Sequence, residues 1–283
     1  MKKKTKIMGI VNVTPDSFYV PSCAPTTDLA IEKAHKLIAE GADCIDIGGE
    51  SSRPANVYGG LEKVSLEEEL KRVIPVVKKL APCVKVPLSI DTTKPEVAQQ
   101  AIHNGATMIN DITGFTDPEM RKLAATTQVD VCVMHMRGQP VNMQEKPFYE
   151  KGVVAEVYDF LDKQTKLLLA EGVFPEHIII DPGIGFGKSV EDNFELVKNI
   201  CLFQSLGFRD LYGISRKSFI YRFLNKERND ILSATIALNS QLILAQADMI
   251  RVHDVVDHRE ARDLLFMTRV ISEPAIPFNV NQV

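Results

Sequence analysis

Cysteine is scarce in this sequence. Five cysteines occur among the 283 residues, and no two of them form a Cys-x-x-Cys pair. An odd number of scattered thiols suits neither a disulfide framework nor a zinc site, and free cysteines are commonly buried. The sequence therefore predicts structural or incidental thiols at Cys23, Cys44, Cys83, Cys132 and Cys201.

Long apolar runs are also absent. No stretch approaches the roughly 18 residues that a membrane-spanning helix needs. The start Met1-Lys2-Lys3-Lys4 leads into a charged strand rather than an apolar signal segment. The sequence therefore predicts a cytoplasmic protein with no membrane partner.

Neither sign of charge is in large excess. The 33 basic and 37 acidic residues leave a formal net charge of -4. No general positive field would attract nucleic acid or an anionic lipid surface, so neither is expected as a partner. Any anionic ligand has to be bound by a local cluster of basic residues.

What the sequence does contain is a regular alternation of strand-like and helix-like segments. Its hydrophobic content of 45% supports one large core. Eight β-rich runs alternate with amphipathic segments of helical spacing, which predicts a (β/α)8 TIM barrel, an α/β fold, over residues 1–271 and a C-terminal extension at 272–283. The expected strands are residues 7–13, 44–47, 86–90, 108–112, 129–134, 177–180, 211–214 and 249–252, and the expected helices include 28–40, 65–80, 95–104, 151–171, 231–247 and 257–270.

Local signals mark the ends of the helices. Two irregular segments, residues 14–27 and 49–64, follow the first two strands and are predicted to form long loops at the reactive rim of the barrel. The predicted N-caps are Asp28, Ser65 and Asp117, and the predicted helix stops are Gly41, Gly105 and Gly172.

Polar residues stand where the expected strands end. Individual ones could be helix caps, since Asp, Asn and Ser favour the position before a helix. Capping explains the set poorly, because Asp91, Asn110 and Asp181 come from three strands and would converge at one rim. A ring of carboxylates and amides suits a nitrogen-rich heterocycle with several donors and acceptors. The set comprises Asn12, Asp46, Asp91, Asn110, His135, Asp181, Ser215 and Arg251.

Two basic clusters close the last two expected strands. Ser215-Arg216-Lys217-Ser218 follows the seventh strand, and Arg251 and His253 end the eighth. Parallel barrels commonly bind a phosphate at the carboxyl rim beside these two strands. The sequence therefore favours a phosphorylated small molecule as the ligand.

Two further features have simpler interpretations. Gly187-Lys188-Ser189 looks like the end of a nucleotide-binding loop, but Pro182 replaces the required upstream glycine, so a flexible rim turn is favoured. His135 stands alone at a strand end, with no second histidine at a suitable spacing. It is interpreted as a hydrogen-bonded wall residue rather than a metal ligand.

Seven blocks along the chain together resemble the signatures of dihydropteroate synthases, in the order in which that family has them. The similarity extends from residue 7 to about residue 270, and seven ordered blocks are far more specific than any single motif. They are Met8-Gly9-Ile10-Val11-Asn12-Val13-Thr14-Pro15-Asp16-Ser17-Phe18, Gly41-Ala42-Asp43 with Ile45-Asp46-Ile47-Gly48-Gly49-Glu50-Ser51-Ser52-Arg53-Pro54, Ser89-Ile90-Asp91-Thr92, Ile109-Asn110-Asp111-Ile112, Asp181-Pro182-Gly183-Ile184-Gly185-Phe186-Gly187-Lys188, Ser215-Arg216-Lys217-Ser218 and Arg251-Val252-His253-Asp254.

The resemblance implies a transferase of folate biosynthesis. Such an enzyme condenses 6-hydroxymethyl-7,8-dihydropterin diphosphate with 4-aminobenzoate to give 7,8-dihydropteroate and diphosphate, and sulfonamides mimic the second substrate. Matching positions one by one, the dihydropterin would contact Asp91, Asn110, Ile112, Met134, Asp181, Phe186 and Lys217; the diphosphate would contact Asn12, Arg251 and His253, with Mg2+ at Asn12; and 4-aminobenzoate would contact Phe18, Ser52, Arg53, Pro54 and Ser218. The catalytic roles fall on Asp91, Lys217, Arg251 and His253.

The chemistry of these side chains agrees with the implied roles. An ionised Asp181 can accept two hydrogen bonds from an amino-pyrimidine edge, and Lys217 can donate to a ring oxygen or nitrogen. Departure of diphosphate puts negative charge on oxygens near Arg251, His253 and Mg2+, and positive charge on a methylene near Asp91. We expect a dissociative substitution that depends on positioning and electrostatics and needs no nucleophilic side chain.

The sequence departs from the family pattern in the two long loops. After residue 18 the family usually has a small residue, Asp and glycines, whereas this chain has Tyr19-Val20-Pro21-Ser22-Cys23. Val20 removes a carboxylate and Pro21 stiffens the segment, while Ser52 replaces the usual Thr but keeps the hydroxyl. The departure bears on aminobenzoate affinity, sulfonamide response and turnover. Ser218 also has a simpler interpretation as an N-terminal cap.

Two other functions remain open at this stage. A non-catalytic pterin-binding homologue would bind the pterin diphosphate without forming dihydropteroate. A pterin-barrel methyltransferase acting on a folate and a corrinoid protein has no diphosphate to bind. Three basic features argue against it: Arg53, the cluster Ser215-Arg216-Lys217-Ser218, and Arg251 with His253. Since such barrels often pair, the final two helices, residues 231–247 and 257–270, are predicted to form a homodimer face.

Overall fold

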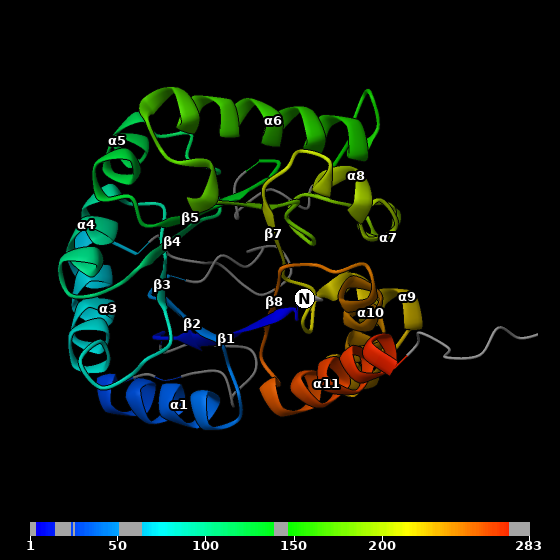
Figure 1. The fold of residues 1–283 in the computed structure, drawn as a ribbon, viewed down its shortest axis with the longest axis horizontal. Helices are drawn as coiled ribbons and strands as arrows, with labels where there is room; N and C mark the ends of the chain where they lie inside the picture. Colours follow the sequence, from blue (N-terminus) through cyan, green and yellow to red (C-terminus); the bar gives the residue numbers. More distant parts are fainter. Residues whose placement is uncertain (1–3, 15–23, 25, 51–63, 139–146, 272–283) are drawn as a thin grey trace, which may run out of the picture.

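Eight parallel strands form a closed barrel in the computed structural model, in consecutive order and with β8 pairing with β1. The structure describes residues 4–14, 24, 26–50, 64–138 and 147–271. Helices surround the central strands (Figure 1), so the predicted TIM barrel is confirmed. The strands are β1 (Lys6–Asn12), β2 (Cys44–Gly48), β3 (Leu88–Asp91), β4 (Met108–Asp111), β5 (Asp130–Met134), β6 (Ile178–Asp181), β7 (Arg209–Tyr212) and β8 (Met249–Val252).

The helices pack on the outer face of the barrel because each has an apolar side. In α3 (Leu66–Leu80), for example, Val73, Val76, Val77 and Leu80 recur at helical spacing and are buried. These side chains join the outward-facing residues of the strands in one large core. The other helices of the described chain are α1 (Thr27–Ala39), α4 (Pro95–His103), α5 (Pro118–Thr127), α6 (Val153–Glu171), α7 (Val190–Lys198), α8 (Ile200–Gln204), α9 (Ser218–Leu224), α10 (Leu232–Leu244) and α11 (Val255–Ile271).

The helix ends follow the predicted signals, with one correction. Ser65 and Asp117 are N-caps, and their side chains accept hydrogen bonds from backbone N–H groups of the first turn. Asp28 was predicted to cap α1 but lies in its first turn. Thr26 is the N-cap instead, because its extended backbone lets its hydroxyl accept from the N–H of Leu29 at 3.3 Å. The predicted stops Gly41, Gly105 and Gly172 all have positive φ, which glycine adopts without strain.

The seventh strand lies two residues earlier than the sequence predicted. Its observed range is Arg209–Tyr212, so Gly213 and Ile214 already belong to the loop that follows. The carbonyl of Ile214 accepts from the N–H of Lys217, which closes a turn, and α9 begins at Ser218. The polar cluster of residues 215–218 therefore lies in a rim loop and helix start rather than directly at the strand end.

The described cysteines are two buried and two exposed thiols. Cys44 and Cys132 are buried, and burial raises the pKa of both thiols, which keeps them protonated. Cys83 and Cys201 are exposed free thiols. Cys23 lies outside the described residues. Among those residues no helix has the length and apolar character needed to cross a bilayer.

Candidate active site

Inside the barrel, an apolar layer is followed by a polar one. Side chains of a strand alternate between its faces, so a residue two positions further along points the same way. The buried cluster of Met8, Cys44, Met108, Cys132, Ile179, Leu211 and Met249 is the apolar layer. Two positions after Cys44, Met108, Ile179 and Met249 come the polar residues Asp46, Asn110, Asp181 and Arg251. The polar side chains predicted to bind substrates thus converge at the carboxyl ends of the strands.

Arg251 is at the centre of this polar layer. Its Nε donates to Asp46 Oδ2 at 2.6 Å, and its Nη2 donates to Asp91 Oδ2 at 2.9 Å. The side-chain amide of Asn110 donates to the same Asp46 oxygen at 3.2 Å. Residues predicted for the diphosphate and for the pterin are therefore joined in one hydrogen-bonded network, through a carboxylate to which the sequence assigned no role.

The loop after β6 brings Asp181, Lys217 and Phe186 together. Asp181 Oδ1 accepts from the N–H of Gly183 at 2.7 Å. Lys217 Nζ donates to the carbonyl of Ile184 and lies 4.4 Å from the centroid of the Phe186 ring. Gly183 has a φ of +69°, and a Cβ there would lie 1.8 Å from the carbonyl oxygen of His135. Only glycine fits this turn, in which one oxygen of Asp181 accepts from the loop backbone.

Two of these groups change charge near neutral pH. Burial raises the pKa of Asp91 to about 7, and the Asp46 carboxylate adds to the rise while Arg251 opposes it. Burial lowers the pKa of Lys217 to about 7, although Asp181 favours its charged form. A ligand that donates to Asp91 and accepts from Lys217 would select the charged forms of both. Such perturbed groups are typical of functional sites.

The two basic clusters contact each other at the rim. The N–H of His253 donates to Ser215 Oγ at 3.2 Å, and Ser215 Oγ lies 2.9 Å from His253 Nδ1. The direction of the second contact depends on the imidazole tautomer: where Ser215 Oγ donates to Nδ1, a neutral His253 carries its proton on Nε2. Arg216 is buried and makes a bidentate ion pair with Asp254 at 2.8 Å, so its guanidinium is directed at a side chain of the protein. In that tautomer His253 can donate a hydrogen bond to an anion through Nε2.

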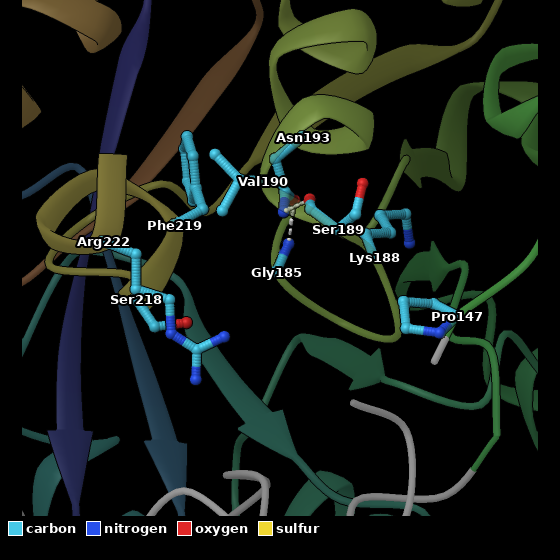
Figure 2. Close-up of a pocket in the computed structure, with 9 residues that line it drawn as sticks. All are labelled: Pro147, Gly185, Lys188, Ser189, Val190, Asn193, Ser218, Phe219 and Arg222. Atoms are coloured by element: carbon cyan, nitrogen blue, oxygen red, sulfur yellow. Dashed lines mark hydrogen bonds between the residues drawn. The ribbon is translucent and has the colours of Figure 1, made fainter. Parts of the chain in front are cut away.

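A pocket of about 270 Å³ opens beside this rim, between α7 and α9. Figure 2 shows Ser218 and Arg222 of α9 on one side and the segment from Gly185 to Asn193 on the other. Ser218, which the sequence assigned to the aminobenzoate site, lines this pocket. The alternative that Ser218 caps α9 is wrong, because Lys217 occupies the N-cap position. The Lys217 side chain makes no capping hydrogen bond.

Comparisons with known proteins agree with this geometry. A family model described as a pterin binding enzyme matches residues 8–253. The dihydropteroate synthase of Synechocystis sp. is 43% identical over 255 residues, which cover 89% of this chain and 86% of that protein. The chain belongs to the dihydropteroate synthase family.

Solved structures of the family have the same fold. The Yersinia pestis dihydropteroate synthase in complex with a sulfonamide drug is 37% identical, with a TM-score of 0.88 and 94% of both chains covered. The Xanthomonas albilineans dihydropteroate synthase in complex with 7,8-dihydropteroate is 36% identical, with a TM-score of 0.83, covering 97% of this chain and 95% of that chain. The chain is therefore a folate-biosynthesis transferase of the dihydropteroate synthase type.

The other predicted synthase residues are arranged around the same rim. Asn12 ends β1 and is half-buried, and Met134 ends β5. Ile112 is buried in the first position after β4. Their contacts with substrates stay predictions. Phe18, Ser52, Arg53 and Pro54, predicted for aminobenzoate, and the altered segment 19–23 lie outside the described residues.

His135 and Lys188 form a structural contact behind the synthase rim. His135 is buried, and its Nδ1 lies 3.0 Å from Lys188 Nζ, which also donates to the carbonyls of His135 and Phe186. Burial lowers the pKa of Lys188 well below its usual value. Ser189 is the N-cap of α7 in a capping box. These contacts agree with a hydrogen-bonded wall residue at His135 and with a rim turn rather than a phosphate-binding loop.

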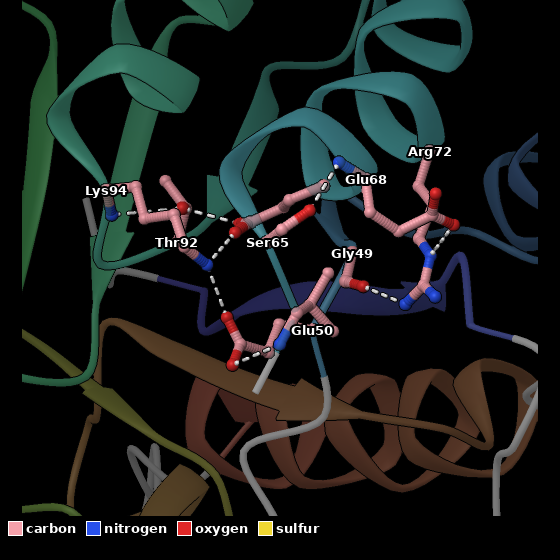
Figure 3. Close-up of polar contacts among 9 residues, drawn as sticks. Gly49, Glu50, Ser65, Glu68, Arg72, Thr92 and Lys94 are labelled. Atoms are coloured by element: carbon pink, nitrogen blue, oxygen red, sulfur yellow. Dashed lines mark hydrogen bonds and ion pairs between the residues drawn. The ribbon is translucent and has the colours of Figure 1, made fainter. Parts of the chain in front are cut away.

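A second polar cluster, which the sequence did not indicate, fixes the base of the loop after β2. Figure 3 shows Lys94 between two carboxylates. Lys94 Nζ donates to Glu50 at 2.5 Å and to the buried Glu69, and Thr92 Oγ1 donates to Glu69 at 2.6 Å. Glu50 Oε1 accepts from the N–H of Val64 at 3.4 Å. The residues on both sides of segment 51–63, in which the family signature continues, are thereby held together.

Proposed function

We propose that this chain condenses 6-hydroxymethyl-7,8-dihydropterin diphosphate with 4-aminobenzoate to give 7,8-dihydropteroate and diphosphate. The observation that carries the proposal is the position of Asp91, Asn110 and Asp181 at one end of one barrel: Arg251 donates to Asp91, shares the Asp46 oxygen with Asn110 and acts electrostatically on Asp181. The first three offer the acceptors and donors of a pterin site, and the guanidinium offers the partner of a diphosphate. Seven ordered signature blocks and family relatives support the same reaction.

The pterin ring would be held by hydrogen bonds to Asp181 and Lys217. Asp181 has one oxygen occupied by Gly183 and the other available for an amino-pyrimidine edge. Lys217 can exchange its bond to the Ile184 carbonyl for a ring acceptor, and the neighbouring Phe186 ring supports its charge. A mostly buried site strengthens each of these charge-assisted bonds.

The diphosphate would lie between Arg251 and His253, close to Asn12. Within the described residues no group of three or more His, Cys, Asp or Glu side chains could hold a metal ion. The proposed Mg2+ would be held by the amide oxygen of Asn12 together with oxygens of the diphosphate, a donor set of the kind that Mg2+ prefers. When bound, Mg2+ would supply charge that offsets the negative oxygens of the leaving diphosphate.

The reaction would proceed by loss of diphosphate before the arylamine attacks. The C–O bond to diphosphate breaks and its electron pair leaves with the diphosphate, the C–N bond to the arylamine forms, and the proton that the amine loses passes to the diphosphate or to solvent. Arg251 and an Nε2–H group of His253 would donate to the departing oxygens, while the Asp91 carboxylate would lie near the cationic methylene. Ser218, on the pocket between α7 and α9, would donate to the aminobenzoate carboxylate. Positioning of two bound substrates supplies the remaining acceleration.

Product formation by the purified chain tests this proposal. With pterin diphosphate and Mg2+, we expect 7,8-dihydropteroate to form only when 4-aminobenzoate is added, and to stop when EDTA removes the metal and resume when Mg2+ is restored. Liquid chromatography of the products, together with a diphosphate assay, gives the result. Tight pterin binding without product would favour the non-catalytic homologue, and tighter binding of methyltetrahydrofolate would favour the methyltransferase.

We also propose that the enzyme is a homodimer through α10 and α11. These helices pack side by side (Figure 1), and Leu244, Leu264 and Met267 are exposed large apolar residues on them. A second copy is the expected partner, because symmetric pairing covers the same apolar patch on both chains. Leu264→Glu should shift the sedimentation equilibrium towards monomers. The matched variant Phe174→Glu, at an exposed apolar residue elsewhere, should leave it unchanged.

A further inference from the structure

Asp46 is a buried carboxylate beneath the residues predicted to bind substrates. It lies on β2, two positions after Cys44 of the apolar layer, and its exposed fraction is 0%. A fully buried carboxylate is rare unless a partner compensates its charge. Solvent does not reach the Asp46 side chain, and its hydrogen bonds within the described residues are with other side chains of the barrel.

Asp46 connects side chains from three strands. Its Oδ2 accepts from Arg251 Nε on β8 at 2.6 Å and from the Asn110 amide on β4 at 3.2 Å. These strands are not neighbours of β2, since β1 and β3 lie between. The carboxylate therefore fixes the relative positions of a predicted diphosphate residue and a predicted pterin residue across the barrel.

We infer that Asp46 is a positioning residue that holds Arg251 in the orientation needed to bind the diphosphate, an inference that rests on the proposed function. Arg251 has two partners of different accessibility. Asp91 is partly exposed, with a side-chain exposure of 14%, and can exchange Arg251 for the pterin. Asp46 has an exposure of 0% and keeps its hold on Nε. The opposite edge of the guanidinium is thereby presented to the diphosphate oxygens.

The remaining oxygen of Asp46 supports this role. Oδ1 is buried and has no hydrogen-bond partner among the residues that the structure describes. A buried acceptor without a partner destabilises a protein, and buried ion pairs often stabilise less than apolar side chains of similar size. Stability therefore does not account for a carboxylate at this position. The electrostatic attraction between the Asp46 carboxylate and Arg251, in surroundings of low dielectric constant, does account for it.

Steady-state kinetics of Asp46→Asn test the inference. The amide has almost the same shape but no charge, so Arg251 loses the ion pair that fixes its Nε. We expect the KM for pterin diphosphate to rise about tenfold or more, as for loss of a charged hydrogen bond, with the KM for 4-aminobenzoate nearly unchanged. The matched control is Asp210→Asn, which removes another fully buried carboxylate. Asp210 lies on β7 and accepts from the N–H of Asp248 and from the side-chain amide of Gln204. It should leave both KM values unchanged.

Three results would overturn the inference: an unchanged KM for pterin diphosphate, an equal rise for both substrates, or the same rise in Asp210→Asn. If Asp46→Asn does not fold, calorimetric binding of pterin diphosphate to Arg251→Met and to Arg251→Met/Asp46→Asn replaces it. The two affinities should agree within about twofold if Asp46 acts through Arg251, as in a double-mutant cycle, and a much weaker double variant would contradict this. Absence of dihydropteroate from the wild-type chain would instead refute the proposed function.

Discussion

Arg251→Ala should weaken the binding of pterin diphosphate by about 2 to 5 kcal/mol, the usual effect of removing one partner of a desolvated charge pair. The physical reason is twofold. The diphosphate loses a guanidinium that can donate two parallel hydrogen bonds. In addition, Asp46 and Asp91 lose the cation that now lies 2.6 and 2.9 Å from them, so the site repels an anion. Titration calorimetry without the arylamine measures the change.

Two comparisons separate this effect from a general loss of stability. Arg209→Ala breaks another bidentate pair, with Asp130 at the opposite end of the barrel, and should leave ligand affinity unchanged. Arg251→Ala should also weaken binding of the pterin alcohol much less than binding of the diphosphate. An Arg251→Ala protein with wild-type affinity for the diphosphate would move the anion site elsewhere on the rim.

Asp181→Asn should reduce pterin affinity by on the order of a hundredfold, the effect of losing charge-assisted hydrogen bonds in a buried site. Gly183 requires an acceptor at 2.7 Å, so the variant's single amide oxygen must stay on that N–H. Its NH2 group would then face the pterin, and a donor would meet the donors of the amino-pyrimidine edge. Binding of a dihydropterin without diphosphate, followed by fluorescence or calorimetry, measures the loss.

Asp111→Asn is the matched control for this variant. Asp111 is also buried at the end of a strand, but its oxygens accept only from Thr113 and Phe115 of the following loop among the described residues. The change at Asp111 should lower the free energy of unfolding and leave pterin affinity unchanged. Equal pterin affinity in Asp181→Asn and the wild type would undo the assignment of the pterin site.

Much of the fold could be predicted from the sequence because it depends on local patterns. Apolar runs separated by amphipathic segments gave eight strands in the observed order, and Ser65, Asp117 and Gly172 marked helix ends through bonds to their own neighbours. The start of α1 and the range of β7 were wrong. In each case the deciding factor was backbone conformation: the extended Thr26, and the turn at Ile214 that ends pairing after Tyr212.

Part of the candidate site could also be predicted from local sequence patterns. Position at a strand end marks Asp91, Asn110 and Asp181, and the structure brings them to one rim. Asp46 was noted at a strand end but received no role. A signal existed, because Asp46 follows the buried Cys44 by two residues, as Asn110 follows Met108 and Asp181 follows Ile179. The Lys94 cluster had no such signal. Glu50 follows β2, Glu69 lies on α3 and Lys94 precedes α4, so these residues meet only when the three segments pack together.

The sequence by itself determined the barrel, its family and the residue types at its rim, because hydrophobic periodicity, caps and motif order are properties of neighbouring residues. Only the tertiary structure decided which of these side chains contact each other. Arg251 and Asp46 are 205 residues apart along the chain yet 2.6 Å apart in space. Closure of the barrel between β1 and β8 makes that contact possible, and burial in the closed barrel sets the pKa values of Asp91 and Lys217. Both effects depend on distance and solvent exclusion, which no local pattern of residues contains.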